Sequence, residues 1–296
     1  SLEHLMTHVP RNPWCEVCRR AKATRKPCRR HHSTGIDPPA KKFGDKTTCD
    51  HMDMRTELHR GVGGMCQAIG IKDRGTKWLE GIPTKTKSSL DATVALTDFM
   101  GPFPNIRSMR TDGSLELEAS MTELRIAHDK DDTGVHQHNG VVESTNRIVK
   151  DGTRALLLQA GLPAFYWPWA MEAFSFAYNT ALRLEDGAES PYHLRHGVYF
   201  DGPRIPFGAL VDYIPHPDVL AKQPEFVPRA LPGIFVGYQC TSGRRWKGIY
   251  RVVPLDAFGD AGLTASGTKE PISPHHTREV LTPAGPWMFP LKERYD

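Results

Sequence analysis

Residues 139–159 read NGVVESTNRIVKDGTRALLLQ, and this stretch decides the fold. At about 100° per residue, Glu143, Arg147, Lys150 and Arg154 fall within about 40° of one line along a helix. Apolar side chains gather on the other side, namely Val141, Ile148, Val149, Ala155 and Leu156. We therefore predict a helix with a buried apolar side and an outer face that carries one carboxylate followed by three cations.

Short apolar segments upstream of this helix predict a sheet. Residues 46–54 (KTTCDHMDM), 65–73 (MCQAIGIKD) and 76–84 (TKWLEGIPT) resemble three strands joined by tight turns, as in an antiparallel meander. Ser88, with Asp91 three positions later, is typical of a helix start, and that helix is expected to reach about Met100. Residues 105–111 (NIRSMRT) add a fourth strand. The order predicts a mixed sheet covered by helices, an α/β or α+β domain.

Three carboxylates stand out on these elements. Asp50 lies in the first predicted strand, Asp112 follows the fourth, and Glu143 lies at the start of the charged helix. Singly, each has an ordinary structural explanation, as a turn former or as a partner of the helix dipole. Together they are able to hold two divalent cations roughly 3.5 to 4 Å apart, which activate an attacking oxygen and stabilise a leaving oxygen in phosphoryl transfer. The predicted substrate is a nucleic-acid phosphodiester.

Charge is distributed unevenly along the 296 residues. The net charge is +4, yet the segment from Arg11 to Lys42 holds ten basic residues against Glu16 and Asp37, a net +8, which leaves about −4 for the rest. A basic arm on a mildly acidic body is typical of phosphate-backbone binding, and the alternative is a solvated linker. No run approaches the ~18 apolar residues of a membrane span, so we expect a soluble intracellular protein. Because the chain starts at Ser1, we also expect it to be a piece of a longer polyprotein or gene model.

Four residues near the N-terminus have metal-ligand spacing. His4, His8, Cys15 and Cys18 give H-x3-H-x6-C-x2-C, two nitrogens and two sulfurs that suit tetrahedral Zn²⁺. A second set also fits, made of Cys15 and Cys18 with Cys28 and either His31 or His32. The other cysteines, Cys49, Cys66 and Cys240, lie in strand-like contexts and are predicted core residues. We find no catalytic Ser-His-Asp pattern, no phosphate-binding P-loop and no dinucleotide fingerprint.

The second half of the chain predicts one buried helix and a small β module. Residues 164–179 (AFYWPWAMEAFSFAYN) are apolar nearly all round, so that helix is buried either in this chain or against a second subunit. Residues 231–240 and 244–253 flank a turn and predict a hairpin, and residues 257–296 are interpreted as a mostly irregular tail.

Taken together, these residues resemble the integrase core of Copia-type retrotransposons, within the retroviral integrase superfamily. The resemblance rests on Asp50, Asp112 and the NGVVE string with Glu143, and on Arg147 and Lys150. It extends to PRNPWCEVCRRAK (10–22), DRGTKWLE (73–80), TRALLLQAGLPAFYWPWA (153–170), IPFGALVDY (205–213) and PGIFVGY (232–238), and it covers roughly residues 4–255.

The resemblance implies a ribonuclease-H-like mixed five-stranded sheet flanked by helices. Composition and the resemblance together divide the chain into a zinc module with a basic arm at 1–32, a linker at 33–42, the catalytic core at 43–185, a β module at 186–256 and a tail at 257–296. The resemblance also implies that Asp50, Asp112 and Glu143 bind two Mg²⁺ (or Mn²⁺) ions and that His4, His8, Cys15 and Cys18 bind Zn²⁺. DNA contacts are expected at Arg147, Lys150 and Arg154 and at Arg19, Arg20, Arg29 and Arg30.

The implied activity is a DNA-integrating nucleotidyl transferase and endonuclease, with element ends and target DNA as partners. A homo-oligomer and a nuclear location are expected, without a membrane or a small-molecule substrate. The interval from Asp112 to Glu143 is shorter than in most relatives, HQHNG replaces a Pro- and Gln-rich lead-in, and Ser144 stands where Arg commonly follows the Glu. Two alternatives therefore stay open, a silent integrase relic that only binds nucleic acid and a ribonuclease-H-type nuclease.

Overall fold

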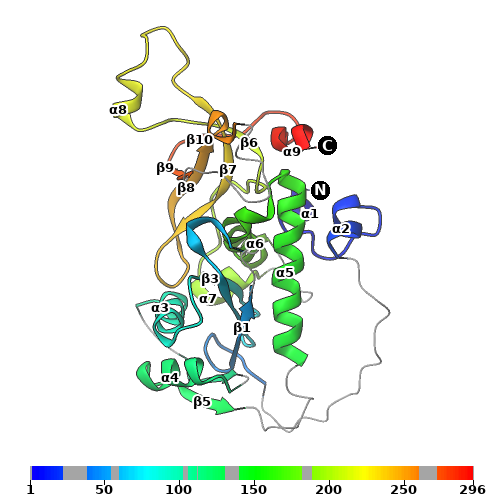
Figure 1. The fold of residues 1–296 in the computed structure, drawn as a ribbon, viewed down its shortest axis with the longest axis vertical. Helices are drawn as coiled ribbons and strands as arrows, with labels where there is room; N and C mark the ends of the chain where they lie inside the picture. Colours follow the sequence, from blue (N-terminus) through cyan, green and yellow to red (C-terminus); the bar gives the residue numbers. More distant parts are fainter. Residues whose placement is uncertain are drawn as a thin grey trace.

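The computed structural model describes residues 2–22, 39–54, 60–102, 106–111, 113–130, 140–181, 189–259 and 272–295 (Figure 1). Several predicted site residues, namely Asp112, Arg29 and Arg30, and the alternative zinc ligands Cys28, His31 and His32, lie outside the described residues.

The first sheet has five strands in the order β3-β2-β1-β4-β5. Its strands are β1 (Thr47–Asp53), β2 (Gln67–Asp73), β3 (Leu79–Thr84), β4 (Ser108–Thr111) and β5 (Ala127–Lys130). The first three form the predicted antiparallel meander, and β4 and β5 continue the sheet in parallel with β1. The predicted fold class, a mixed five-stranded sheet flanked by helices, is confirmed.

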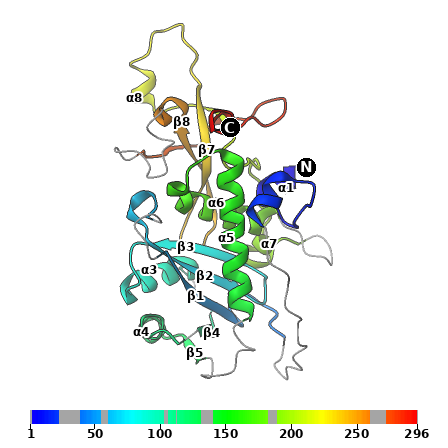
Figure 2. The ribbon, with the colours of Figure 1, turned by 45° about the vertical axis from the view of Figure 1, so that its right-hand side comes forward.

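Successive side chains along each strand point to opposite faces of the sheet, and each face is covered by a different layer of helices (Figure 2). On one face, Cys49, Ile69 and Ile71 pack in a core with α3 (Ser89–Met100) and α4 (Leu115–Glu123). On the other face, Met52, Ala68 and Leu79 pack with α5 (Gly140–Ala160) and α6 (Trp167–Ala181). The Ser88 hydroxyl accepts a hydrogen bond from the Asp91 N–H, which confirms the predicted start of α3.

Helices α5 and α6 lie against each other because a glycine opens the space between them. A Cβ at Gly152 would lie 2.1 Å from Cε2 of Phe174, so any side chain there would push α6 away. The sequence left open whether the apolar α6 is buried in this chain or against a second subunit, and the structure shows that it is buried in this chain. On α5, Val149, Ala155 and Leu156 are buried as predicted, but Val141 is 39% exposed in the first turn.

A second, antiparallel sheet has the order β10-β6-β7-β8-β9 and lies toward the C-terminal end of α5, with the β7–β8 hairpin reaching back along α6 (Figure 1). Its strands are β6 (Leu210–Tyr213), β7 (Leu231–Cys240), β8 (Trp246–Pro254), β9 (His275–Thr277) and β10 (Val280–Leu281). The β7–β8 pair is the predicted hairpin. The tail, which was expected to be mostly irregular, contains the short elements β9, β10 and α9 (Pro290–Tyr295). Strands of two or three residues are too short to show an alternating pattern.

A partly buried ionic network joins this second sheet to the core. Arg244, in the β7–β8 turn, lies 3.4 Å from the Glu80 carboxylate of β3 and 3.0 Å from that of Asp98 on α3. Arg251 of β8 lies 2.7 Å from the carboxylate of Glu172 on α6. Burial raises the pKa of Glu80, against the opposing effect of Arg244. The two sheets are therefore held together by paired charges as well as by apolar contact.

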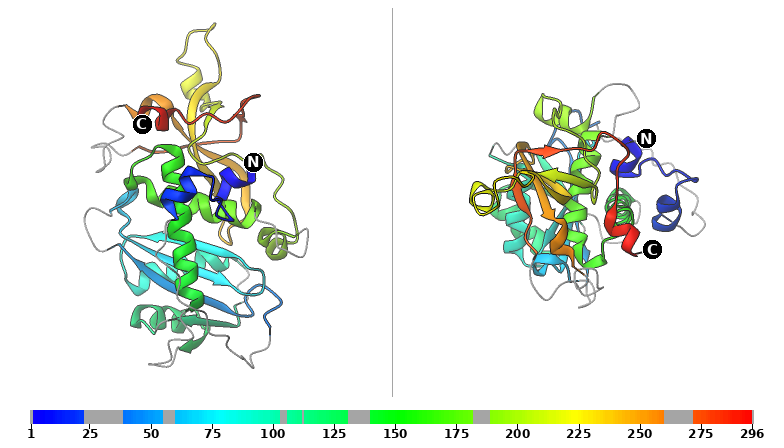
Figure 3. Two further views of the ribbon diagram at one scale, coloured as in Figure 1. Left: turned by 90° about the vertical axis from the view of Figure 1, so that its right-hand side faces the viewer. Right: turned by 90° about the horizontal axis from the view of Figure 1, so that it is seen from above.

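The N-terminal segment packs on the side of α5 and α6 (Figure 3). It contains α1 (Leu2–Thr7) and α2 (Glu16–Ala21), and Met6 is buried against Ala177 and Ala181 of α6. The remaining helical turns are η2 (Val62–Gly64), η3 (Ala164–Tyr166), α7 (Pro191–His196), α8 (Pro217–Leu220) and η4 (Leu255–Phe258). None of the helices in the described ranges is both long and apolar enough to cross a membrane.

Candidate active site and metal centre

Asp50 is held at the junction between the sheet and α5. It lies in β1 directly opposite Gly70 of β2 and is half-buried. The side-chain amide of Asn146 on α5 donates a hydrogen bond of 2.8 Å to Asp50 Oδ2. This contact joins residues 96 positions apart and fixes the direction of the carboxylate.

The absence of a side chain at Gly70 makes that contact possible. A Cβ at Gly70 would lie 2.1 Å from Asn146 Oδ1, a distance at which no side chain fits. The same oxygen is buried and accepts no hydrogen bond from the described residues. Asn146 is therefore wedged between the Gly70 backbone and the Asp50 carboxylate, and sequence reasoning missed both Gly70 and Asn146.

Glu143 lies one turn before Asn146 on α5. Residues three apart lie on one side of a helix, so Asn146 and Glu143 project from the same side of α5. Glu143 is exposed and lines an open groove of about 660 Å³ together with Arg147 of α5 and Lys72 of β2. The structure thus places two of the three predicted carboxylates, Asp50 and Glu143, around the first turns of α5.

Lys72 is a basic residue of this groove that the sequence did not single out. Its ammonium donates a 2.6 Å hydrogen bond to the Lys77 carbonyl and lies 5.1 Å from the centre of the Tyr178 ring. Burial, and then the neighbouring charge of Lys77, lower the pKa of Lys72 to about 8. Strand alternation could have found it, because position 72 faces the same side of β2 as Gly70.

The remaining predicted DNA contacts differ in their surroundings. Arg147 is exposed and Lys150 is half-buried. Arg154 donates to the Ala21 carbonyl at 3.0 Å and to Asp151 at 2.7 Å, so its guanidinium ties α5 to the end of α2. On α2, Arg20 pairs with Glu16 at 3.5 Å, and Arg19 is exposed.

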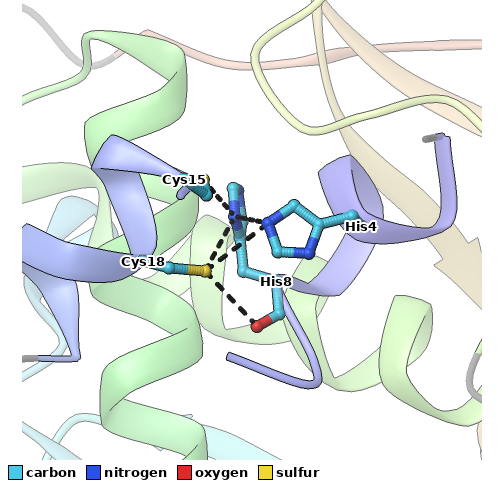
Figure 4. Close-up of side chains that lie close together, drawn as sticks. All are labelled: His4, His8, Cys15 and Cys18. Atoms are coloured by element: carbon cyan, nitrogen blue, oxygen red, sulfur yellow. Dashed lines mark hydrogen bonds between the residues drawn. The ribbon is translucent and has the colours of Figure 1, made fainter. Parts of the chain in front are cut away.

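The four predicted zinc ligands come together (Figure 4). One ligand atom from each of His4, His8, Cys15 and Cys18 lies within 4.8 Å of all the others. His8 Nδ1 is 3.2 Å from His4 Nε2, 3.6 Å from Cys18 Sγ and 3.7 Å from Cys15 Sγ, and Cys18 Sγ is 3.5 Å from His4 Nε2. Two imidazoles and two thiols converging on one point fit the donor set of structural zinc.

Burial favours the uncharged form of the histidines in this cluster. It lowers the pKa of His8 to about 4, against the opposing hydrogen bond with Gln159, and it also lowers the pKa of His4. Burial raises the pKa of the Cys18 thiol. Neutral imidazole is the form that binds a metal, whereas each thiol must lose its proton to solvent and bind the cation as a thiolate.

Asp50 and Glu143 offer oxygen ligands, the type that Mg²⁺ prefers, and Glu143 shares its groove with the cations Arg147 and Lys72. Asp112, the third predicted ligand, lies outside the described residues.

No family model matches the chain. The chain is 26% identical over 141 residues to the retrovirus-related Pol polyprotein from transposon TNT 1-94 of Nicotiana tabacum, a match that covers 45% of the chain and 10% of that polyprotein. The match confirms the predicted resemblance to a retrotransposon integrase core, and the chain spans about a tenth of the length of this relative.

Two solved integrase structures are also similar to the chain. The catalytic core domain of HTLV-2 integrase in complex with magnesium is 16% identical, with a TM-score of 0.40, and the match covers 53% of this chain and 99% of that one. The simian T-cell lymphotropic virus intasome in complex with PP2A regulatory subunit B56 gamma is 13% identical, with a TM-score of 0.39, covering 71% and 75%.

Proposed function

We propose that the chain is the integrase of a retrotransposon polyprotein and joins element DNA ends to target DNA by phosphoryl transfer. The similarity to the tobacco polyprotein supports this ancestry. The observation that carries the proposal is the hydrogen bond between Asn146 and Asp50, because it brings the helix of Glu143 onto the strand of Asp50. A carboxylate pair beside a basic groove suits a phosphodiester substrate.

The residues of the site have distinct roles in this proposal. Asp50, Asp112 and Glu143 would hold Mg²⁺ ions, which would supply activation of the attacking oxygen and stabilisation of the leaving oxygen. Asn146 holds the Asp50 carboxylate in one orientation, so less reorganisation is needed when the site is loaded. The Arg147 guanidinium lines the groove beside Glu143 and is free to reach a phosphate of the DNA.

The N-terminal His/Cys cluster has a structural role in the same proposal. A zinc ion there would fix α1 to α2, two short helices that lack a large core of their own. The module so formed packs on α5 and α6 and brings the cations of α2 to the side of α5. DNA is the proposed partner of these cations, and a homo-oligomer and a nuclear location are proposed with it.

The proposal is tested with the full chain, Mg²⁺ and a labelled DNA end. We expect joined products from the unaltered protein and none above background from Asp50→Asn or Glu143→Gln, with unchanged unfolding midpoints. Glu225→Gln, at an exposed carboxylate in the loop between β6 and β7, is the matched control and should join DNA normally. Full joining by Asp50→Asn would refute the carboxylate assignment.

The same assay separates the alternatives. Bound but unjoined DNA that is unaffected by Glu143→Gln would identify a nucleic-acid-binding relic. Cleavage of the RNA strand in a hybrid, without joining, would identify a ribonuclease-H-type nuclease instead.

A further inference from the structure

Gln159, near the C-terminal end of α5, makes two buried contacts with the N-terminal module. It is 3% exposed. Its Oε1 lies 2.8 Å from His8 Nε2, and its Nε2 donates to the Leu5 carbonyl at 3.1 Å. A backbone carbonyl only accepts, so the NH₂ of the amide must face Leu5 and the oxygen must face His8. The two contacts together fix the orientation of the amide.

The orientation of Gln159 also fixes the tautomer of His8. The amide oxygen only accepts, so the hydrogen bond requires a proton on His8 Nε2. A neutral imidazole carries one N–H, and its other nitrogen, Nδ1, then presents a lone pair. Nδ1 is the His8 atom that lies 3.2 Å from His4 Nε2 and 3.6 Å from Cys18 Sγ. The nitrogen left unprotonated is therefore the one that faces the other ligands.

The backbone of His8 is held as firmly as its ring. His8 has φ +52, in the left-handed region, which is strained for a non-glycine residue. Its N–H donates to the His4 carbonyl at 2.7 Å, and its own carbonyl accepts from Lys22 Nζ at 2.5 Å. These contacts offset the strain and keep a buried ring aimed at the cluster.

We propose that Gln159 is a positioning residue of the metal cluster, which selects the His8 tautomer that binds zinc through Nδ1. This inference rests on the zinc site proposed above and extends it to a residue 151 positions away from His8. Helix α5, which also carries Glu143, then contributes the Gln159 side chain that orients His8 in the cluster. Zinc binding and the packing of the N-terminal module on α5 thereby become one coupled equilibrium.

Two substitutions of Gln159 separate positioning from packing. Gln159→Met keeps the length of the side chain and removes the acceptor, and Gln159→Glu keeps an acceptor oxygen. In competition with a chromophoric chelator, the full chain with Gln159→Met should bind Zn²⁺ about 10- to 100-fold more weakly. Gln159→Glu should stay within about threefold of the unaltered chain, and Gln223→Met, in the β6–β7 loop, should not change the affinity. Equal affinity of Gln159→Met and the unaltered chain, or equal weakening by Met and Glu, would overturn the inference.

A measurement on the unaltered protein does not depend on how the variants fold. Long-range ¹H–¹⁵N spectra of the zinc-loaded chain should show His8 protonated at Nε2 and metal-bound at Nδ1. The opposite assignment would overturn the role of Gln159 and leave the zinc site intact. If the unaltered chain binds no stoichiometric Zn²⁺, the proposed zinc site itself fails, so the two failures are distinguishable.

Discussion

Gly70→Ala tests the wedge of Asn146 between β2 and Asp50. The new Cβ would lie 2.1 Å from Asn146 Oδ1, and ordinary contact begins near 3.4 Å, so the amide must retreat by about 1.3 Å. Such a shift breaks the 2.8 Å hydrogen bond to Asp50. Crowding costs about 1 to 3 kcal/mol, and the loss of a hydrogen bond to a carboxylate costs about 1.5 to 3 kcal/mol. These losses are partly offset by the ~0.4 to 1 kcal/mol that Gly→Ala contributes by reducing the entropy of the unfolded chain. With partial relaxation, we expect a net loss of about 2 kcal/mol in the free energy of unfolding.

The assay is urea denaturation of Gly70→Ala, Asn146→Ala and the double variant. Asn146→Ala alone should cost about 1 kcal/mol, because it removes the bond to Asp50 and also a buried oxygen without a partner. In the double variant the added methyl occupies space that the amide has left, so the double should be more stable than the sum of the singles predicts by at least about 1 kcal/mol.

A matched control uses the neighbouring glycine of β3. A Cβ at Gly81 would lie 2.6 Å from Val149 Cγ1 and 2.8 Å from Met171 Cγ, so Gly81→Ala crowds the same helical layer through these two side chains rather than through Asn146. Its coupling to Asn146→Ala should be smaller than the coupling of Gly70→Ala. Additivity of Gly70→Ala and Asn146→Ala within about 0.5 kcal/mol would refute the wedge. Because Gly70→Ala displaces Asn146 and thereby the Asp50 carboxylate, we expect the rate of DNA joining to fall about 100-fold.

Three further predictions concern other parts of the molecule. Arg147→Ala should lower the slope of log binding constant against log salt by about 1 in filter binding with DNA, whereas an unchanged slope would mean that Arg147 contacts no phosphate. Arg244→Met should destabilise the chain by about 3 kcal/mol in urea, because it leaves Glu80 buried without its cation, and adding Glu80→Gln should recover part of the loss. Burial, followed by the charge of Arg195, lowers the pKa of His196 to about 4 from 6.5, so the unfolded chain binds more protons between these values and the free energy of unfolding falls as the pH drops from 6.5 to 4. His196→Gln should flatten this fall by about 1 kcal/mol, less than the full shift implies because the side chain is half-buried, and equal slopes in both proteins would contradict the assignment.

Local signals in the sequence predicted much of the fold. The Ser88–Asp91 cap, the β1–β3 meander and the β7–β8 hairpin depend on residues close in the chain, and each was found where the pattern placed it. The convergence of His4, His8, Cys15 and Cys18 was also predictable, since spacing and residue type alone define a candidate donor set.

Contacts between distant elements account for what the sequence did not predict. The match between Gly70 and Asn146 depends on how closely α5 approaches β2, and nothing near either residue indicates the other. The sequence predicted only that Gln159 lies at the end of a helix, whereas its side chain forms a hydrogen bond with His8 in the N-terminal module. Helix α4 and strand β5 were not individually predicted, because the segment 115–130 mixes charged and apolar residues without a clear period.

The length of α5 has a consequence for how this chain can evolve. Glu143 and Gln159 are 16 positions apart on one uninterrupted helix. This separation corresponds to about 24 Å along the helix axis, and the two side chains point about 160° apart around it. Inserting or deleting a single residue between them would swing one end by about 100° and separate it from its partners. We expect natural relatives to vary this helix in sequence far more readily than in length, because a gap there would remove either the contacts of Gln159 with His8 or the position of Glu143 in its groove.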